Sequence, residues 1–197
     1  MPLNTDRHFD SQLDAYVARI SVGDCYVTNK DEVISTVLGS CIAACIRDPL
    51  AGIGGMNHFM LPGCGAARAG GDELAERRYG AASMEVLINA LLAQGGRKER
   101  FEIKLFGGAE LLAGGSSRIG QANTRFAHEF IRLEGLNLAA ADCGGPYPRR
   151  VQYWPATGRA MVMNMPLERA QTELANEQKV AKTLAQKMPE GDIELFD

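Results

Sequence analysis

The sequence predicts one α+β domain in which mainly antiparallel strands form the core and helices pack outside it. Predicted strands outnumber predicted helices, and several of the strands are joined by tight turns. The 197 residues are 46% apolar, which is ordinary for a globular protein and supports a sizeable core. We expect the folded catalytic domain over residues 17–165, a mobile tail over residues 1–16 and a polar helical extension over residues 166–197.

Two apolar runs around one turn form the central element of this prediction. The runs cover residues 36–46 and 53–61, and the first is rich in Val, Leu, Ile, Ala and Cys. Between them, Asp48 and Pro49 suit the first two positions of a type I turn, because proline presets φ at about −65°. The stretch therefore predicts a hairpin of two buried strands.

The register of this hairpin places a cysteine opposite a histidine. If the turn is centred between Pro49 and Leu50, Cys41 faces His58. Directly opposed residues of an antiparallel pair share a face, with Cβ atoms about 4.5–5.5 Å apart. A neighbouring imidazole favours the thiolate, so we expect Cys41 to be a nucleophile with a pKa below the ordinary ~8.5. A slip of one residue would place the two side chains on opposite faces.

Two other interpretations of these residues stay open. A cysteine in an apolar run is usually a core residue. Cys41, Cys45, His58 and Cys64 also form a C-x3-C-x12-H-x5-C pattern that resembles a zinc site. On an extended strand Cys41 and Cys45 would be about 13 Å apart, whereas two thiolates on one zinc ion lie within about 4 Å of each other. The metal interpretation requires residues 41–45 to be helical, and we expect no metal and no other cofactor.

The remaining elements follow from turn residues and apolar spacing. Residues 17–27 predict a strand that breaks at Gly23-Asp24, and residues 63–72 predict a glycine-rich loop beside the hairpin. Residues 101–106 alternate apolar and charged side chains, as a half-buried strand does, and Gly107-Gly108 follows them. The other predicted elements are helices over residues 79–94, 120–133 and 167–188, a short strand over residues 136–141, and a hairpin of residues 151–154 with 159–163.

Charge and composition exclude several classes of protein. The net charge of −3 argues against nucleic acid as a partner. No apolar run spans a bilayer's thickness without a charge, so we expect no membrane insertion, and the polar N-terminus lacks the regions of a signal peptide. The odd number of cysteines, irregularly spaced, fits reduced thiols better than a disulfide framework, so we expect a cytoplasmic protein.

The hairpin and the blocks around it resemble the CheD family, the chemoreceptor glutamine deamidases of bacterial chemotaxis. The most specific likeness is TVLGSCIAACIRDP followed by GGMNHFMLP. Supporting blocks are ISVGDCYV before it and KLFGGA, IGQAN and YPRRVQYWPATGR after it, so that the likeness covers residues 20–165. The resemblance implies a β-sandwich-like core flanked by helices, a fold shared with bacterial toxin deamidases.

The resemblance also implies roles for three residues. Cys41 matches the family's nucleophile and His58 its catalytic histidine. The family's third catalytic position, a hydroxyl residue six positions before the cysteine, falls on Ser35. In a straight strand Ser35 would lie about 20 Å from Cys41, so the chain must bend near Gly39 to bring the hydroxyl to the site.

The residues alone indicate a cysteine hydrolase or acyl transferase, and the resemblance implies the substrate. That substrate is a set of glutamines on the helical cytoplasmic domain of chemoreceptors, which are converted to glutamate. Long coiled-coil helices suit a shallow surface cleft, and we expect its substrate-binding residues to be Ser40, Asn57, Gly107 and Gly108. The resemblance implies an alternative as well, a binding module that docks a CheC-type phosphatase or receptors without turnover.

Overall fold

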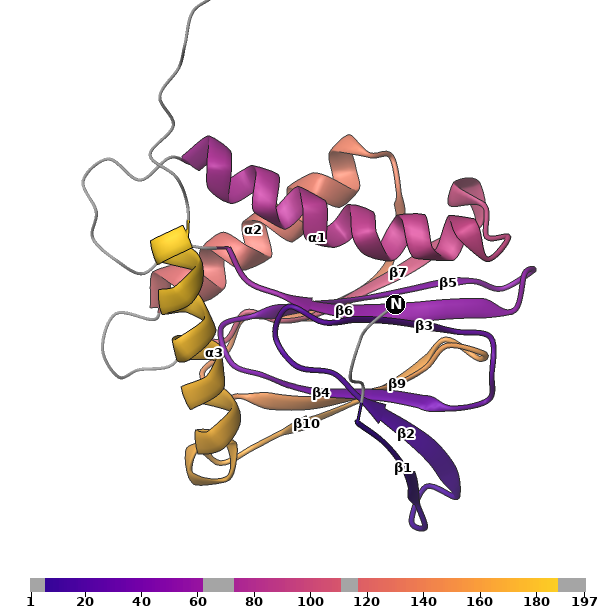
Figure 1. Ribbon diagram of the computed structural model, residues 1–197, viewed down its shortest axis with the longest axis horizontal. Coiled ribbons are helices and arrows are strands. Elements are labelled where there is room, and N and C mark those ends of the chain that lie inside the picture. Colours follow the sequence, from indigo (N-terminus) through magenta and orange to yellow (C-terminus); the bar gives the residue numbers. More distant parts are fainter. Residues whose placement is uncertain (1–5, 62–72, 111–116, 188–197) are drawn as a thin grey trace, which may run out of the picture.

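The computed structural model describes residues 6–61, 73–110 and 117–187 of the chain (Figure 1). The loop predicted over residues 63–72, with Cys64, lies outside the described residues. The helices are α1 (Glu73–Ala93), the short 3-10 helix η1 (Lys98–Arg100), α2 (Ser117–Leu133) and α3 (Leu167–Lys187). The strands are β1 (Asp6–Asp10), β2 (Ala15–Arg19), β3 (Cys25–Thr28), β4 (Val33–Leu38), β5 (Ile42–Asp48), β6 (Ile53–Phe59), β7 (Glu102–Gly107), β8 (Asn137–Cys143), β9 (Arg149–Trp154) and β10 (Arg159–Asn164).

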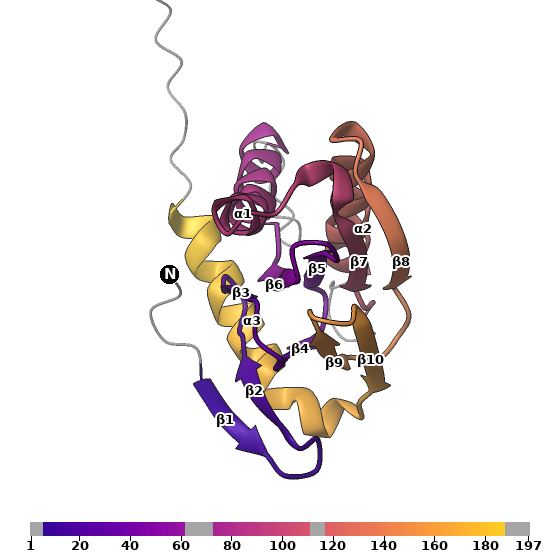
Figure 2. The ribbon, with the colours of Figure 1, turned by 90° about the vertical axis from the view of Figure 1, so that its right-hand side faces the viewer.

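Two five-stranded sheets pack face to face (Figures 1 and 2). One sheet has the order β1-β2-β4-β9-β10 and the other β3-β6-β5-β7-β8. Most neighbouring strands are antiparallel, whereas β2 pairs with β4, and β7 with β8, in parallel. The core between the sheets consists of Ile20, Ile34, Leu38, Cys41, Ala43, Cys45, Met56, Met60, Phe106, Val151 and Tyr153. The fold is therefore the predicted α+β class with a β-sandwich core.

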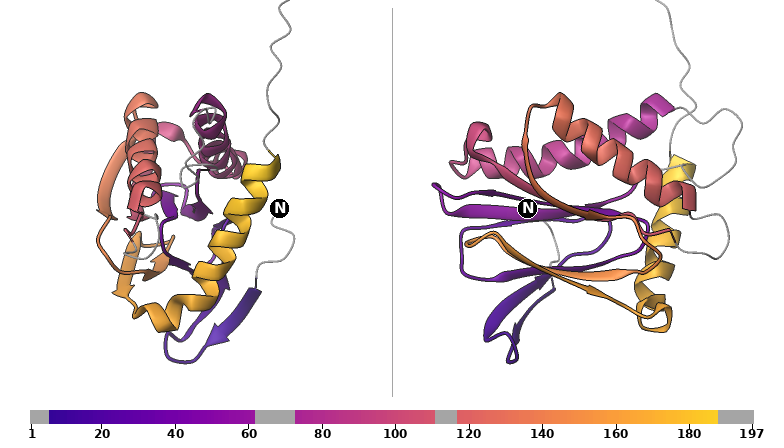
Figure 3. Two further views of the ribbon diagram at one scale, coloured as in Figure 1. Left: turned by 90° about the vertical axis from the view of Figure 1, so that its left-hand side faces the viewer. Right: turned by 180° about the vertical axis from the view of Figure 1, so that it is seen from behind.

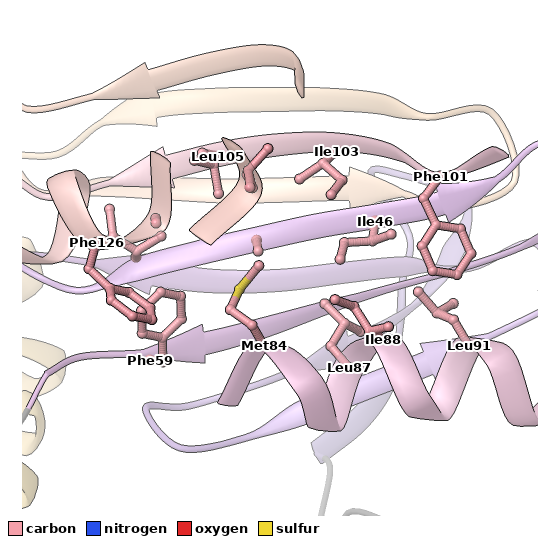
Figure 4. Close-up of a cluster of buried hydrophobic side chains, with 14 of the residues drawn as sticks. Ile46, Phe59, Met84, Leu87, Ile88, Leu91, Phe101, Ile103, Leu105 and Phe126 are labelled. Atoms are coloured by element: carbon pink, nitrogen blue, oxygen red, sulfur yellow. The ribbon is translucent and has the colours of Figure 1, made fainter. Parts of the chain in front are cut away.

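Helices α1 and α2 cover the outer face of the sheet that contains β5 and β6 (Figures 1 and 3). Figure 4 shows the apolar side chains that fill this second core. Ile42 and Ile46 of β5 belong to it, whereas Ala43 and Cys45 point between the two sheets. Because residues 42–46 of β5 are buried on both faces, this part of the strand is a continuous apolar run with no polar alternation.

Strands β5 and β6 form the predicted hairpin, with a register that differs from the predicted one by two residues. Asp48 pairs with Ile53, so that Ala43 stands opposite His58. Successive side chains of a strand alternate between its faces, so a shift of two residues leaves every side chain on its predicted face. Cys41 and His58 consequently still face the same core.

The turn explains the difference in register. The Asp48 carboxylate accepts hydrogen bonds from the N–H groups of Leu50 at 3.0 Å and Ala51 at 3.1 Å. Gly52 then adopts a φ of 66° and donates its N–H to the Asp48 carbonyl. The loop thus has four residues between paired strand ends, whereas the predicted register assumed a two-residue centre.

Residues 6–19 form a β-hairpin, which differs from the mobile tail predicted over residues 1–16. Strand β1 pairs with β2, which in turn pairs with β4. The Arg7 side chain stacks 4.1 Å from the centre of the Tyr16 ring and donates to the Glu32 carboxylate at 2.8 Å. An edge strand such as β1 carries mostly exposed polar side chains, so its sequence resembles a tail while its backbone is ordered by the neighbouring strand.

Helix α3 runs along one end of the sandwich and crosses both sheets (Figures 1 and 3). Among the α3 side chains that the structure describes, Ala170 and Glu177 are buried, and the apolar Leu174 and Val180 are half-buried. Their spacing of three or four residues places them on one face of the helix. The part of the C-terminal extension that the structure describes is therefore packed against the domain, at the end where β4 leads into β5.

Candidate active site

Cys41 lies where the chain crosses from one sheet to the other. Strand β4 ends at Leu38, Gly39 and Ser40 form a bend, and β5 begins at Ile42. The bend that the sequence required near Gly39 is present. The Cys41 side chain is fully buried and belongs to the core between the sheets.

The end of β7 holds the backbone of this crossover. The N–H of Gly108 donates to the Cys41 carbonyl at 2.7 Å, and the N–H of Ala109 donates to the Gly39 carbonyl at 2.8 Å. Gly107 has a φ of 115°, and a Cβ atom there would overlap the Cys41 carbonyl oxygen, so glycine alone permits this approach. Gly107 and Gly108, which were predicted to contact substrate, lie against the backbone of the nucleophile and fix its position.

Asn123 of α2 ties the crossover to the end of β6. Its Nδ2 donates to the Ser40 carbonyl at 2.8 Å, and its Oδ1 accepts from the N–H of Leu61 at 2.8 Å. Asn123 is completely buried, so both bonds are shielded from water. The Ser40 carbonyl is thereby used within the fold, and a substrate contact of Ser40 stays a prediction.

His58 meets Cys41 inside the sandwich. The Cys41 sulfur, one ring nitrogen of His58 and a carboxylate oxygen of Glu177 all lie within 4.8 Å of one another. Ala43 is the residue directly opposite His58, so Cys41 is its diagonal neighbour. Diagonal neighbours on one face remain within reach of long side chains, which explains why the pair forms despite the shifted register.

A threonine orients the His58 ring. The Thr36 hydroxyl lies 2.8 Å from the Ile20 carbonyl and 2.8 Å from Nδ1 of His58. A hydroxyl has one proton, and a carbonyl only accepts, so the Thr36 proton goes to Ile20. Nδ1–H of His58 therefore donates to Thr36, and Nε2 is the ring nitrogen that faces Glu177, 3.4 Å from its carboxylate.

The hydroxyl beside His58 thus belongs to Thr36, which corrects the assignment to Ser35. Ile34, Thr36 and Leu38 share the face of β4 that points into the sandwich, where His58 lies. Ser35 is on the opposite face of the same strand, and its carbonyl accepts from the N–H of Ile20. Adjacent side chains of a strand point to opposite faces, so Ser35, six positions before the cysteine, faces away from His58.

We expect Thr36→Val to reduce turnover by about 10- to 100-fold, as the loss of an orienting hydrogen bond does at other sites. Valine keeps the shape of threonine and leaves Nδ1–H of His58 without an acceptor. Thr36→Ser should restore most of the rate, and Ser35→Ala should stay close to the parent. Initial rates of glutamine deamidation, with a pH–rate profile for each variant, measure this. A Ser35→Ala variant slower than Thr36→Val would return the role to Ser35.

Glu177 of α3 completes the buried cluster. Its Oε1 accepts from the N–H of Gly39 at 2.9 Å and lies 3.4 Å from Nε2 of His58. The Cys41 sulfur lies within 4.8 Å of a Glu177 carboxylate oxygen. Nε2 of His58 has no hydrogen-bond partner within the described residues. The carboxylate therefore lies between the thiol, the imidazole and a backbone N–H.

These surroundings shift the pKa of the Cys41 thiol in the direction opposite to the one expected from the sequence. Burial, followed by the negative charge of Glu177 and its hydrogen bond, raises the pKa of the Cys41 thiol well above its ordinary value. A lowered pKa was expected because the sequence indicated His58 as the neighbour of Cys41 and gave no sign that α3 covers the pair. With α3 in this position, Cys41 is held as the unreactive thiol.

Asn57 lies on the other face of β6, away from the site. Its Oδ1 accepts from the N–H of Ala44 at 3.0 Å, and its Nδ2 donates to the Ser83 carbonyl at 2.9 Å. Asn57 thus connects β5 and β6 to α1. The structure does not bring this predicted substrate contact to Cys41.

The three side chains of the cluster are also donor types that bind zinc. Among the described residues, Cys41, His58 and Glu177 form the group whose donor atoms converge within 4.8 Å. Cys45 does not join them, because β5 is extended and carries it away along the core. Cys41, Cys45 and His58 of the zinc-like spacing therefore do not converge on one point. The fourth residue of that spacing, Cys64, lies outside the described residues.

Sequence reasoning missed Thr36, the N–H of Gly39 and Glu177. The signal for Thr36 was the alternation in β4, where it follows Ile34 on the same face. No comparable signal marked Glu177, because an acidic residue in a polar helix is normally solvated. Only the packing of α3 across the end of the sandwich reveals it.

Comparison with known proteins gives a family match for this chain. The family profile described as CheD chemotactic sensory transduction matches residues 60–164. Within the described residues, no helix has the length and apolarity needed to cross a membrane.

Three curated relatives cover most of the chain, and each is named a probable chemoreceptor glutamine deamidase CheD. The relative from Methylobacillus flagellatus is 43% identical over 98% of this chain and 96% of its own length. The relative from Thiobacillus denitrificans is 43% identical over the same shares. The relative from Burkholderia vietnamiensis is 48% identical over 85% of this chain and 68% of its own length. The chain belongs to the CheD family.

Proposed function

We propose that the chain hydrolyses glutamine side chains of chemoreceptors to glutamate, and that Cys41, His58 and Thr36 carry out the reaction. One observation supports this above all others: a thiol, an imidazole fixed by a hydroxyl, and a backbone N–H converge on one point. That combination provides a nucleophile, a proton carrier and an oxyanion donor for acyl transfer. The names of the relatives supply the substrate class.

The first half of the reaction forms a thioester. Nε2 of His58 takes the Cys41 proton, and the sulfur attacks the amide carbon of the substrate glutamine. The N–H of Gly39 receives the developing oxyanion, since it already binds an oxygen at 2.9 Å, within the range that oxyanion donors need. The imidazolium then gives its proton to the amide nitrogen, the C–N bond breaks and ammonia leaves.

The second half releases glutamate. His58, again neutral, takes a proton from water as the hydroxide adds to the thioester carbon. The C–S bond breaks, and the proton returns to the Cys41 sulfur. Thr36 stays hydrogen-bonded to Nδ1–H throughout, so the ring keeps the orientation that both proton transfers require.

Chemoreceptor substrates place this activity in the cytoplasm, where their helical signalling domains lie. A CheC-type phosphatase as a further partner stays a prediction, because no described contact distinguishes such a partner from a receptor. The convergence of Cys41, His58 and Thr36 favours turnover over docking alone, since docking needs a surface and not a thiol–imidazole pair.

Mass spectrometry of a receptor fragment tests the proposal. A purified cytoplasmic fragment is incubated with the parent protein and, in parallel, with Glu177→Ala, in which the buried carboxylate is absent. Conversion of particular glutamines to glutamate, with ammonia released in equal amount, is expected. If neither protein converts any glutamine of the fragment, the proposed function is overturned.

We expect deamidation to survive exhaustive removal of metal. The proposed steps use a thiol, an imidazole and backbone N–H groups, and none of them passes through a metal ion. Protein dialysed against EDTA should retain its parent rate, and metal analysis should find less than stoichiometric zinc. Loss of activity that zinc alone restores would favour the Cys41–His58–Glu177 cluster as a metal site.

A further inference from the structure

Helix α3 brings a glutamate side chain to the point where the proposed reaction would create one. Glu177 is only 4% exposed, and its carboxylate touches the thiol, the imidazole and the backbone N–H that the mechanism uses. Deamidation of a glutamine on a helix would leave a glutamate in these same contacts. Glu177 therefore has the chemistry and the placement of a bound product.

A structural role alone does not account for this carboxylate. Within the described residues, the basic side chain in contact with this carboxylate is His58, whose Nε2 lies 3.4 Å away, and no lysine or arginine pairs with it. A buried carboxylate without a strong cationic partner is costly, because burial removes its hydration. An apolar residue at position 177 would pack the helix at lower cost, so the carboxylate indicates a function of the contact.

Over residues 167–180, few apolar side chains attach α3 to the domain. The described part of the helix buries Ala170 and Glu177 fully, while Leu174 and Val180 are half-buried. So little apolar surface contributes modestly to stability. A small open pocket lies between α3 and the domain, with His58 and Thr36 on one wall and Glu173 and Glu177 on the other. The helix thus covers Cys41 and His58 but leaves an open pocket beside them.

We propose that α3 is an autoinhibitory helix that occupies the substrate site of its own chain, with Glu177 as a product mimic. This inference rests on the proposed function and names the shape of the substrate: a helix that presents one glutamine from the face corresponding to Ala170, Leu174 and Glu177. A receptor helix has to displace α3, and the tethered helix competes at a high effective concentration. Activity in the free protein is reduced by the fraction of molecules in which α3 is docked.

The decisive experiment converts the product mimic into a substrate. In the full-length Glu177→Gln variant, the amide carbon takes the place of the carboxylate carbon beside Cys41. Attack by the Cys41 sulfur releases ammonia, and water cleaves the thioester, so that residue 177 returns to glutamate. We expect peptide mass spectrometry to find glutamate at position 177 in the purified variant and glutamine in the Cys41→Ala/Glu177→Gln double variant.

Two other positions of the same helix provide matched controls. Gln178 is exposed and should stay a glutamine in every protein. Glu168→Gln places a new amide in the first turn of α3, where the side chain is exposed, and should also stay a glutamine. Conversion at these positions as well as at position 177 would show unselective deamidation and overturn the inference.

Thiol labelling gives a readout that needs no turnover. Glu177→Ala should make iodoacetamide label Cys41 at least about tenfold faster, the change that one pKa unit makes in the thiolate fraction. Glu168→Ala should label at the parent rate. If the amide introduced at position 177 persists and Cys41 labels equally in all variants, α3 does not act as a product mimic, whether or not the receptor fragment is deamidated. Conversion of that amide without conversion of the fragment supports the inference and counts against the receptor substrate.

Discussion

Cys41→Ala is expected to reduce glutamine deamidation below detection while leaving the fold intact. The sulfur forms the thioester, and alanine provides no nucleophile to replace it. The side chain is completely buried, but cysteine and alanine are close in size, so the free energy of unfolding should fall by only about 1 kcal/mol. Ammonia release and peptide mass spectrometry measure the reaction, and chemical denaturation measures stability.

Cys45→Ala is the matched control for this variant. Cys45 is equally buried in the core between the sheets and belongs to β5, yet it lies outside the cluster of Cys41, His58 and Glu177. Its loss should lower stability to a similar extent and leave the rate near that of the parent. A folded Cys41→Ala protein with full activity would remove Cys41 from the mechanism.

His58→Gln is expected to reduce the rate by about 10²- to 10⁴-fold, the usual contribution of a positioned acid–base group. The glutamine amide occupies the position of the imidazole, but it cannot accept the thiol proton or deliver it to the amide nitrogen that leaves as ammonia. The backbone bonds of His58 to Gly23 and Asp24 do not depend on the side chain, so β3 and β6 should stay paired. Single-turnover rates of thioester formation measure the loss directly.

His8→Gln is the control for the loss of a histidine, because His8 is exposed on β1, at the outer edge of the other sheet. It should leave the rate unchanged. If His58→Gln forms the thioester at the parent rate, the proton carrier is another group and the mechanism must be redrawn.

The thiol–imidazole pair was predictable from sequence because it depends on which face each side chain occupies. The predicted register was in error by two residues, since the turn is longer than the one assumed. Cys41 and His58 still share a face, because the side-chain period of a strand is two residues. The two-residue error in the turn therefore left the predicted pair intact, whereas a shift of one residue would have placed the two side chains on opposite faces.

The sequence could not decide whether Ser35 or Thr36 orients His58, because His58 lies in the other sheet. The orienting hydroxyl belongs to β4, whereas His58 belongs to β6, and the two strands lie in different sheets. No spacing along one strand tells which of two neighbouring side chains points across a sandwich. The packing of one sheet on the other makes that choice.

The sequence by itself determined the fold class, the central hairpin and the meeting of Cys41 with His58, because these depend on local periodicity and on turn residues. Only the tertiary structure decided that α3 covers the site and that burial, together with the charge of Glu177, raises the pKa of the Cys41 thiol. That contact joins Gly39 to a residue 138 positions later in the chain. A polar helix with a weak apolar stripe carries no local sign of what it packs against, because its partner surface forms only after both sheets are assembled.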